Sequence, residues 1–494
     1  MQIRIVLDCE ESFKKKAAYT LETFCQVLGL PHRLSRANEV SPTDIVIWYG
    51  PTESSLSARV VFIQASAEAP RLFLERRGLD VSKARRFVLF GEDSVALFFD
   101  EKFARDSTEI VSGDDRCRQI HVDIVASAFY FLSCWQEITS TECDRHERFP
   151  ATASLQYGLG LLETPVVNQY VEILRREIEK LLGHQIEQRP RFGGKEFAIC
   201  MTHDIDYIRK WTLGILYREL VQYFLLGRED GGLGKRFERL KAFQRAVSTR
   251  NDPFTWSLEK ILTVERDLGV HATYFLKTGV TSRHDVSYRI KDGYVRKLLK
   301  TLEFDGHEIG LHPSYHTFLS TAKMRGEKER LDEVLGRKSN AVRQHFLRLR
   351  IPETWKIQAE LNFQHDSTLG FPDHEGFRAG ICHPFRPYDA SQDVVVDLWE
   401  IPLLAMDGTF QSYRNKSAGE SLDIIRSLIK AVKRYCGVAV LLFHNTCYDN
   451  LDFPDWGKVF EDTLHFALGE GAFVGSAEEI LTSYLESLNR PIRQ

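Results

Sequence analysis

Apolar runs alternate with amphipathic stretches along most of the chain, which is the pattern of an α/β protein. Strand-like runs in the first part lie at residues 3–7, 44–49, 59–63 and 87–90. An amphipathic helix is expected over 12–28, ending near Gly29. The apolar segment 124–135 is long and contains Ala and Ser, which favours a buried helix over a strand. These patterns predict a small N-terminal α/β domain.

A regular helix–strand rhythm begins near residue 253. A helix expected over 254–268 is followed by a strand over 271–276, and the pattern repeats with a helix over 288–304 and a strand over 307–311. Further strands are expected at 341–346, 398–404 and 438–443. Helices that alternate with strands in this way predict a parallel sheet.

The polar connector 183–195, which follows a helix expected over 166–182, separates the two patterns. We therefore expect an N-terminal α/β domain with its connecting helix over 1–189, and a second domain over 190–494. A chain of 494 residues is long enough for two or three domains.

The stretch 197–206 combines a buried strand with chemically active side chains. Its first half, FAICM, is apolar, and Thr202, His203, Asp204 and Asp206 follow where the strand ends. The carboxyl ends of strands are where α/β folds usually carry their chemistry. Side chains at i and i+2 of an extended segment point to the same side, so Asp204 and Asp206 are expected to share one site.

A histidine pair follows the strand expected at 307–311. His312 and His316 are four residues apart, and Pro313 suits the first position of a helix capped by His312. One helical turn would bring both imidazoles onto one face, where they could reach one metal ion together with an aspartate. Two imidazoles and one carboxylate leave positions open for water, as in a catalytic zinc site.

The overall composition is that of an ordinary globular protein, and its charge does not favour binding to nucleic acid. There are 69 acidic and 65 basic residues, for a formal charge of −4. The apolar start of the chain is too short for a secretory signal, and no run reaches the length of a membrane helix. Nine scattered cysteines without a C-x-x-C pair favour neither disulfides nor a zinc ribbon. We expect a cytoplasmic protein without a transmembrane segment.

Two charged segments have more than one interpretation. Between residues 209 and 250, ten Lys or Arg stand against four Asp or Glu, interleaved with aromatic residues. This segment is expected to be a solvated helical pair, a lid over an anionic glycan, or a peripheral membrane contact. The loop 142–148 carries both signs and resembles an active site, but we interpret it as a structural turn of ion pairs.

Four motifs in order, THDID, GLHPSYH, VRQH and LLFH, resemble those of the polysaccharide deacetylases of the NodB-homology type, carbohydrate esterase family 4. The resemblance covers roughly residues 195–485 and implies a distorted (β/α) barrel of about seven strands. The segment 364–387 is similar to a subgroup that carries an extra N-terminal α/β domain. Pro313 departs from the family's second motif, and Gln344-His345 replaces the R-x-P of its third.

The resemblance also implies residue roles. Asp204 would be the catalytic base, and Asp206, His312 and His316 would bind a divalent metal, most readily Zn²⁺. Arg343 would orient the base, and His444, in the last motif, would be the general acid.

The expected activity is metal-dependent removal of N-acetyl groups from an amino-sugar glycan or its precursor, so the expected partner is a carbohydrate. Two alternatives stay open: a hydrolase of a small non-peptide amide, and a catalytically silent glycan-binding pseudoenzyme. Asp204 and His444 speak against the latter, because metal binding alone requires neither.

Overall fold

The computed structural model describes residues 2–489, except 55, 90–92, 100–109, 187–191, 212–236, 286–287 and parts of 240–251. Most of the basic segment 209–250 therefore lies outside the described residues, as does the expected domain boundary at 189/190. Among the described residues, no helix combines the length and the apolar character that are needed to cross a membrane.

The N-terminal region contains a six-stranded sheet in the order β2-β1-β3-β4-β8-β7. Its strands are β1 (Ile3–Leu7), β2 (His32–Leu34), β3 (Ile45–Gly50), β4 (Arg59–Gln64), β7 (Val111–Gly113) and β8 (Cys117–Ile120). All neighbours pair in parallel except β7 and β8. A separate antiparallel hairpin joins β5 (Arg85–Leu89) to β6 (Asp93–Leu97). The strands expected from the sequence are all present.

Helices of this region pack against the sheet and extend toward the second region. They are α1 (Glu11–Leu28), α2 (Glu68–Leu74), α3 (Ile124–Leu132), α4 (Trp135–Thr139), α5 (Leu155–Leu159) and α6 (Val166–Leu182). The expected helix at 12–28 ends at Gly29, whose φ of 64° is the left-handed conformation that glycine adopts without strain. The apolar helix expected at 124–135 is interrupted at Cys134, which has a φ of 51°.

The second region is built on a nine-stranded parallel sheet in the order β16-β13-β12-β11-β10-β9-β18-β17, with β19 paired to β9. Its strands are β9 (Ala198–Ile205), β10 (Thr273–Leu276), β11 (Glu308–Leu311), β12 (Ala341–Val342), β13 (His365–Asp366), β16 (Trp399–Glu400), β17 (Leu403–Met406), β18 (Val438–Leu442) and β19 (Phe473–Gly475). Every residue of β9, β10, β11 and β18 is buried, as expected for strands that are covered on both faces.

The sheet curves until its two ends meet. Strands β16 and β17 stand at opposite ends of the strand order, yet only Ile401 and Pro402 separate them in sequence. So short a link spans about 10 Å at most, and the sheet is therefore a distorted barrel. The α/β class expected from the sequence, a barrel preceded by a smaller α/β region, is confirmed.

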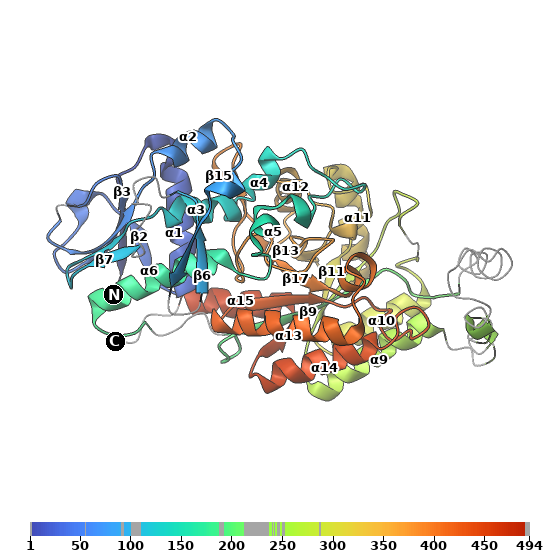
Figure 1. Cartoon of the computed structure of the whole chain (residues 1–494). Helices are drawn as coiled ribbons and strands as arrows, with labels where there is room; N and C mark the ends of the chain where they lie inside the picture. The colour runs from blue at the N-terminus through green and yellow to red at the C-terminus, as the bar shows by residue number, and fades with distance from the viewer. Residues whose placement is uncertain are drawn as a thin grey trace.

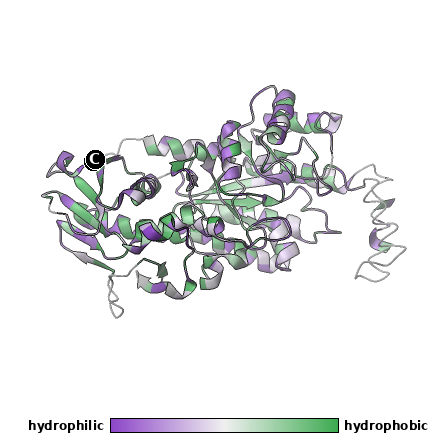
Figure 2. Ribbon diagram, turned by 90° about the horizontal axis from the view of Figure 1, so that it is seen from above, coloured by the Kyte–Doolittle hydropathy of each residue, from purple (hydrophilic) through white to green (hydrophobic). Residues whose placement is uncertain are grey.

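Helices cover the outside of the barrel (Figure 1). They are α9 (Pro253–Leu268), α10 (Gly293–Phe304), α11 (Thr321–Leu335), α12 (Glu353–Glu360), α13 (Ala418–Arg434), α14 (Trp456–Gly469) and α15 (Ala477–Asn489). A further antiparallel pair, β14 (Tyr388–Asp389) and β15 (Val394–Val395), lies outside the barrel sheet. Figure 2 shows mostly hydrophobic strands at the centre, while the surrounding helices carry both colours.

The two regions are joined by an extensive contact. One hydrophobic cluster includes side chains of both, among them Phe131 and Phe377. The Arg378 guanidinium donates to both carboxylate oxygens of Glu137 at 2.8 and 2.6 Å, and both side chains are nearly inaccessible to solvent. Both nonpolar packing and a bidentate ion pair therefore hold the N-terminal region against the barrel.

Candidate metal centre

The carboxyl ends of β9, β11, β12 and β18 bring the chemically active side chains together. Asp204 lies in β9, and Asp206 follows its last residue. The Oδ2 atom of Asp204 and the Oδ1 atom of Asp206 both lie 3.6 Å from Nε2 of His312. The two carboxylates thus meet at one imidazole, as the i, i+2 spacing predicts.

The structure does not bring His316 to this site, so the sequence-based pairing of His312 with His316 is corrected. No helix begins at His312; the chain is irregular there and turns at Tyr315 and His316. Without a helical turn, residues i and i+4 do not share a face. The His316 side chain is exposed, and its backbone N–H donates to Thr281 Oγ1.

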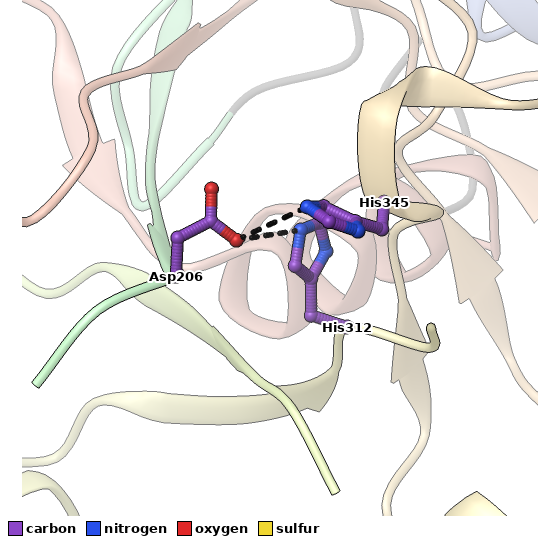
Figure 3. Close-up of side chains that lie close together, drawn as sticks. All are labelled: Asp206, His312 and His345. Carbon is purple, nitrogen blue, oxygen red and sulfur yellow. Dashed lines mark ion pairs between the residues drawn. The ribbon is translucent and has the colours of Figure 1, made fainter. Parts of the chain in front are cut away.

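His345 takes the expected place of His316. Its Nε2 lies 3.5 Å from Oδ1 of Asp206, and Figure 3 shows both imidazoles directed at that oxygen. One ligand atom each from Asp206, His312 and His345 lie within 4.8 Å of one another, the arrangement of a metal-binding cluster. The strand expected at 341–346 ends at Val342, which places His345 in a turn beyond the carboxyl end of β12.

Partners outside the cluster set the orientation of both imidazoles. Nδ1 of His312 lies 2.7 Å from the carbonyl oxygen of Arg343 and can only donate to it. Nδ1 of His345 donates to the Asp285 carboxylate at 2.9 Å. With the proton on Nδ1, each Nε2 presents its lone pair to the cluster, an arrangement found around metal-bound histidines.

Ionisation of these groups also suits metal ligands. Burial lowers the pKa of His312 to about 4, although Asp204 and Asp206 oppose this shift. Burial alone would raise the pKa of Asp206, but Lys277 and the nearby histidines hold it well below its usual value. A neutral imidazole and an ionised carboxylate are the forms that coordinate a metal.

The geometry fits a divalent metal. Ligands about 2.1 Å from a tetrahedral ion are about 3.4 Å apart, close to the 3.5 and 3.6 Å separations from Asp206 Oδ1 to the two histidines. The same Oδ1 is buried, and among the described residues the cation that faces it is Lys277, whose Nζ lies 3.1 Å away. A buried carboxylate needs a cation beside it, which either Lys277 or a metal ion can supply.

Lys277 lies in the same cluster, a residue that the sequence analysis did not single out. It follows the last residue of β10, and its Nζ is 3.1 Å from Asp206 Oδ1 and 2.9 Å from His345 Nε2. The residue is only 1% exposed. Its position one residue past a strand's carboxyl end is the signal that could have identified it.

Arg343 lies beneath the aspartates, fully buried. Its guanidinium donates to Thr202 Oγ1 at 2.6 Å and to Asp204 Oδ1 at 3.4 Å. Two further hydrogen bonds fix it to the carbonyl and hydroxyl oxygens of Ser367, which follows β13. The arginine is thus held rigidly beside Asp204.

His444 lies on the other side of Asp206, with its Nε2 3.7 Å from Oδ2 of that aspartate. Asp407, which follows β17, accepts from Nδ1 of His444 at 2.6 Å and from its backbone N–H at 2.8 Å. Burial by itself would lower the pKa of His444, but Asp407 and then Asp206 outweigh it and raise the pKa to about 10. Asp407 is a second residue that the sequence analysis missed.

The two aspartates and three histidines of the site open into one cavity of about 310 Å³. Its lining includes Asp204, Asp206, His312, His345 and His444, together with Arg145 and Arg148 from the N-terminal region. The sequence predicts a turn of ion pairs over the loop 142–148, and the pair between Arg148 and Asp144 is present at 2.6 Å. The loop also forms part of the cavity wall, which that interpretation did not include.

The comparisons with known proteins give one family and several distant folds. Residues 5–183 match a family of unknown function (DUF7033). No curated protein sequence matches the chain significantly.

Several solved structures are similar to part of this chain. A protein described as a polysaccharide deacetylase from Mycobacterium smegmatis shares 17% identity over 61% of this chain and 95% of its own, with a TM-score of 0.40. The Puue allantoinase shares 12% identity over 62% of this chain and 96% of its own, with a TM-score of 0.39. A pseudoenzyme of the CE4 family from Bacillus anthracis shares 13% identity over 57% of this chain and 65% of its own, with a TM-score of 0.30. With likenesses this distant, the functional conclusion rests on the geometry of this chain's own site.

Proposed function

We propose that the protein is a metal-dependent hydrolase of the polysaccharide deacetylase type, which removes an N-acyl group from an amino sugar in a glycan or its precursor. The proposal rests on two side chains that lie beside the ligand cluster without belonging to it. Asp204 and His444, neither of which belongs to the cluster of Asp206, His312 and His345, line the same cavity. A site that only bound metal would need neither.

Asp206, His312 and His345 would hold the divalent ion, for which a set of two nitrogens and one oxygen suits Zn²⁺. When bound, such an ion polarises the amide carbonyl and makes a water molecule more acidic. Asp204 would accept the proton of the attacking water, as a general base. Arg343 and its contacts to Thr202 and Ser367 hold that carboxylate in place.

His444 would supply the proton that the leaving nitrogen needs. An amine is a poor leaving group until it is protonated, so a general acid must reach it. The raised pKa of His444 keeps the imidazole protonated at neutral pH, and Asp407 fixes its orientation through the hydrogen bond to Nδ1. Nε2 is then the atom that can donate into the cavity.

A second candidate function follows from Lys277. Its Nζ contacts the same Asp206 oxygen and the same His345 nitrogen that a metal would use. A cationic side chain in this position favours a barrel without metal, either a catalytically silent glycan-binding protein or a hydrolase of a small amide. The cavity volume, at the lower end of the range for small-molecule sites, is compatible with such an amide.

Metal analysis with a substrate panel separates these possibilities. The purified protein is analysed for bound Zn²⁺ and assayed for acetate release from N-acetylated mono- and oligosaccharides and for hydrolysis of small cyclic amides. One ion per chain with acetate release would support the deacetylase. Absence of metal after incubation with Zn²⁺ would reject it in favour of the second candidate.

A further inference from the structure

The cavity wall carries two arginines that the deacetylation chemistry does not use. Arg145 and Arg148 come from the loop between α4 and α5, in the N-terminal region, and line the cavity together with the metal cluster. What they could bind rests on the proposed function, because their role concerns the substrate of the same site.

Arg148 is a fixed, preorganised group. It is 2% exposed, and its Nε and Nη2 donate to Asp144 at 2.8 and 2.6 Å. Nη2 also donates to the Tyr413 hydroxyl at 2.8 Å, and Nη1 donates to the carbonyl oxygen of Phe346 at 2.9 Å. These contacts use four of its five N–H groups. The fifth, on Nη1, has no acceptor among the described residues.

Arg145 is less constrained. Its side chain is exposed, and Nε donates to Nε2 of His146 at 3.1 Å. Within the described part of the chain, Nη1 and Nη2 of Arg145 have no hydrogen-bond or ion-pair partner. Four N–H groups of this guanidinium are therefore available to a molecule in the cavity.

The charges of the cavity wall favour an anionic ligand. Its two carboxylates, Asp204 and Asp206, belong to the proposed base and metal cluster. Among the described residues, Asp144 is the one carboxylate that pairs with either arginine. A guanidinium binds carboxylate and phosphate groups through paired hydrogen bonds. A neutral sugar hydroxyl cannot form such a charged pair with it. The volume of about 310 Å³ suits a compact substrate more than a long neutral chain.

We propose that the substrate carries an anionic group, a carboxylate or a phosphate, on the same molecule as the N-acyl group, and that Arg145 and the free Nη1 of Arg148 bind it. The N-terminal region would thereby select the substrate that the barrel hydrolyses. Arg145 is the residue to test, because it is exposed and its replacement leaves the buried hydrogen bonds of Arg148 intact.

Three probes distinguish the possibilities: N-acetylglucosamine, its 1-phosphate and N-acetylmuramic acid, which are neutral, phosphorylated and carboxylated. Binding is measured by calorimetry, which requires no turnover, on wild type, Arg145→Gln and Arg145→Lys. Arg296→Gln, at an exposed position on α10 outside the cavity, is the matched control. We expect wild type and the control to prefer at least one acidic probe, which identifies the anion. Arg145→Gln should weaken that binding about 10-fold, and Arg145→Lys less.

Turnover is then measured on the same proteins. For the acidic substrate, Arg145→Gln should raise KM with little change in kcat, and it should leave the neutral probe unaffected. Equal binding of neutral and acidic probes by wild type, or equal weakening of all three by Arg145→Gln, would overturn the inference. Selective acidic binding without hydrolysis of any probe would support the arginine site and count against the proposed deacetylase activity.

Discussion

Nε2 of His345 lies 3.5 Å from Oδ1 of Asp206, which makes His345, and not His316, the partner of His312. Replacing His345 by Gln should therefore remove one of three protein ligands. Loss of an outer partner of a metal ligand lowers metal affinity by about 10- to 100-fold. Because His345 would be a ligand itself, we expect Zn²⁺ affinity to fall by more than about 100-fold. Calorimetric titration of the purified variants with Zn²⁺ measures this.

The matched control is His316→Gln. His316 is exposed and lies outside the cluster, so this variant should bind Zn²⁺ as wild type does. If His316→Gln lost metal while His345→Gln retained it, the assignment of the ligands would be wrong.

Lys277 contacts two of the ligand atoms, and its positive charge opposes a cation in the cluster. Replacement by Met removes the charge and keeps a side chain of similar length. Like charges a few ångströms apart repel by about 1–4 kcal/mol, depending on the local dielectric, so Zn²⁺ should bind at least about 10-fold more tightly to Lys277→Met. Unchanged or weaker binding would show that Lys277 does not compete with the metal.

Asp407 positions His444 without lining the cavity itself. Asp407→Asn keeps the shape of the side chain and removes its charge. We expect kcat for the N-acyl substrate to fall by about 100-fold, because the general acid loses its orientation and its raised proton affinity. KM, Zn²⁺ content and melting temperature should stay close to those of wild type. A fall in kcat matched by loss of metal would instead indicate a structural role.

Much of the fold follows from the sequence because the central strands of the barrel are buried on both faces. All five residues of β18 are buried, and a run such as VAVLL cannot form a surface strand. Glycines at helix ends were equally informative, since Gly29 and Gly269 both have φ values of 64°. The closure of the barrel was harder to predict from the sequence. Residues 398–404 are expected to form one strand, whereas the structure divides them into β16 and β17 at Ile401-Pro402.

The site was less predictable where it depends on turns. The histidine spacing after β11 suggested a helix, but tertiary contacts hold the chain in another path. One of them is the hydrogen bond from His312 Nδ1 to the carbonyl of Arg343, which follows the neighbouring strand β12. After β12, Phe346 adopts a φ of 60°, a conformation that no local sequence signal announces. The strand expected over 341–346 includes His345, so the position of this residue beyond the strand end could not be foreseen.

The contribution of the N-terminal region to the cavity wall could not be predicted from the spacing of residues along the sequence. Arg145 and Arg148 are about 60 residues from Asp204 in sequence and reach the cavity only because the two regions pack together. The charged loop was correctly seen as a turn of ion pairs, yet the same arginine that pairs with Asp144 also borders the cavity. Such dual roles emerge only from three-dimensional contacts.

We propose that Asp204 acts as a base beside a metal ion that binds without this residue. The most direct test measures Zn²⁺ content by elemental analysis and acetate release from N-acetylated sugars, on wild type and on Asp204→Asn. We expect about one ion per chain in both proteins and acetate release by wild type alone. Loss of metal from Asp204→Asn, or acetate release by that variant at the wild-type rate, would contradict it.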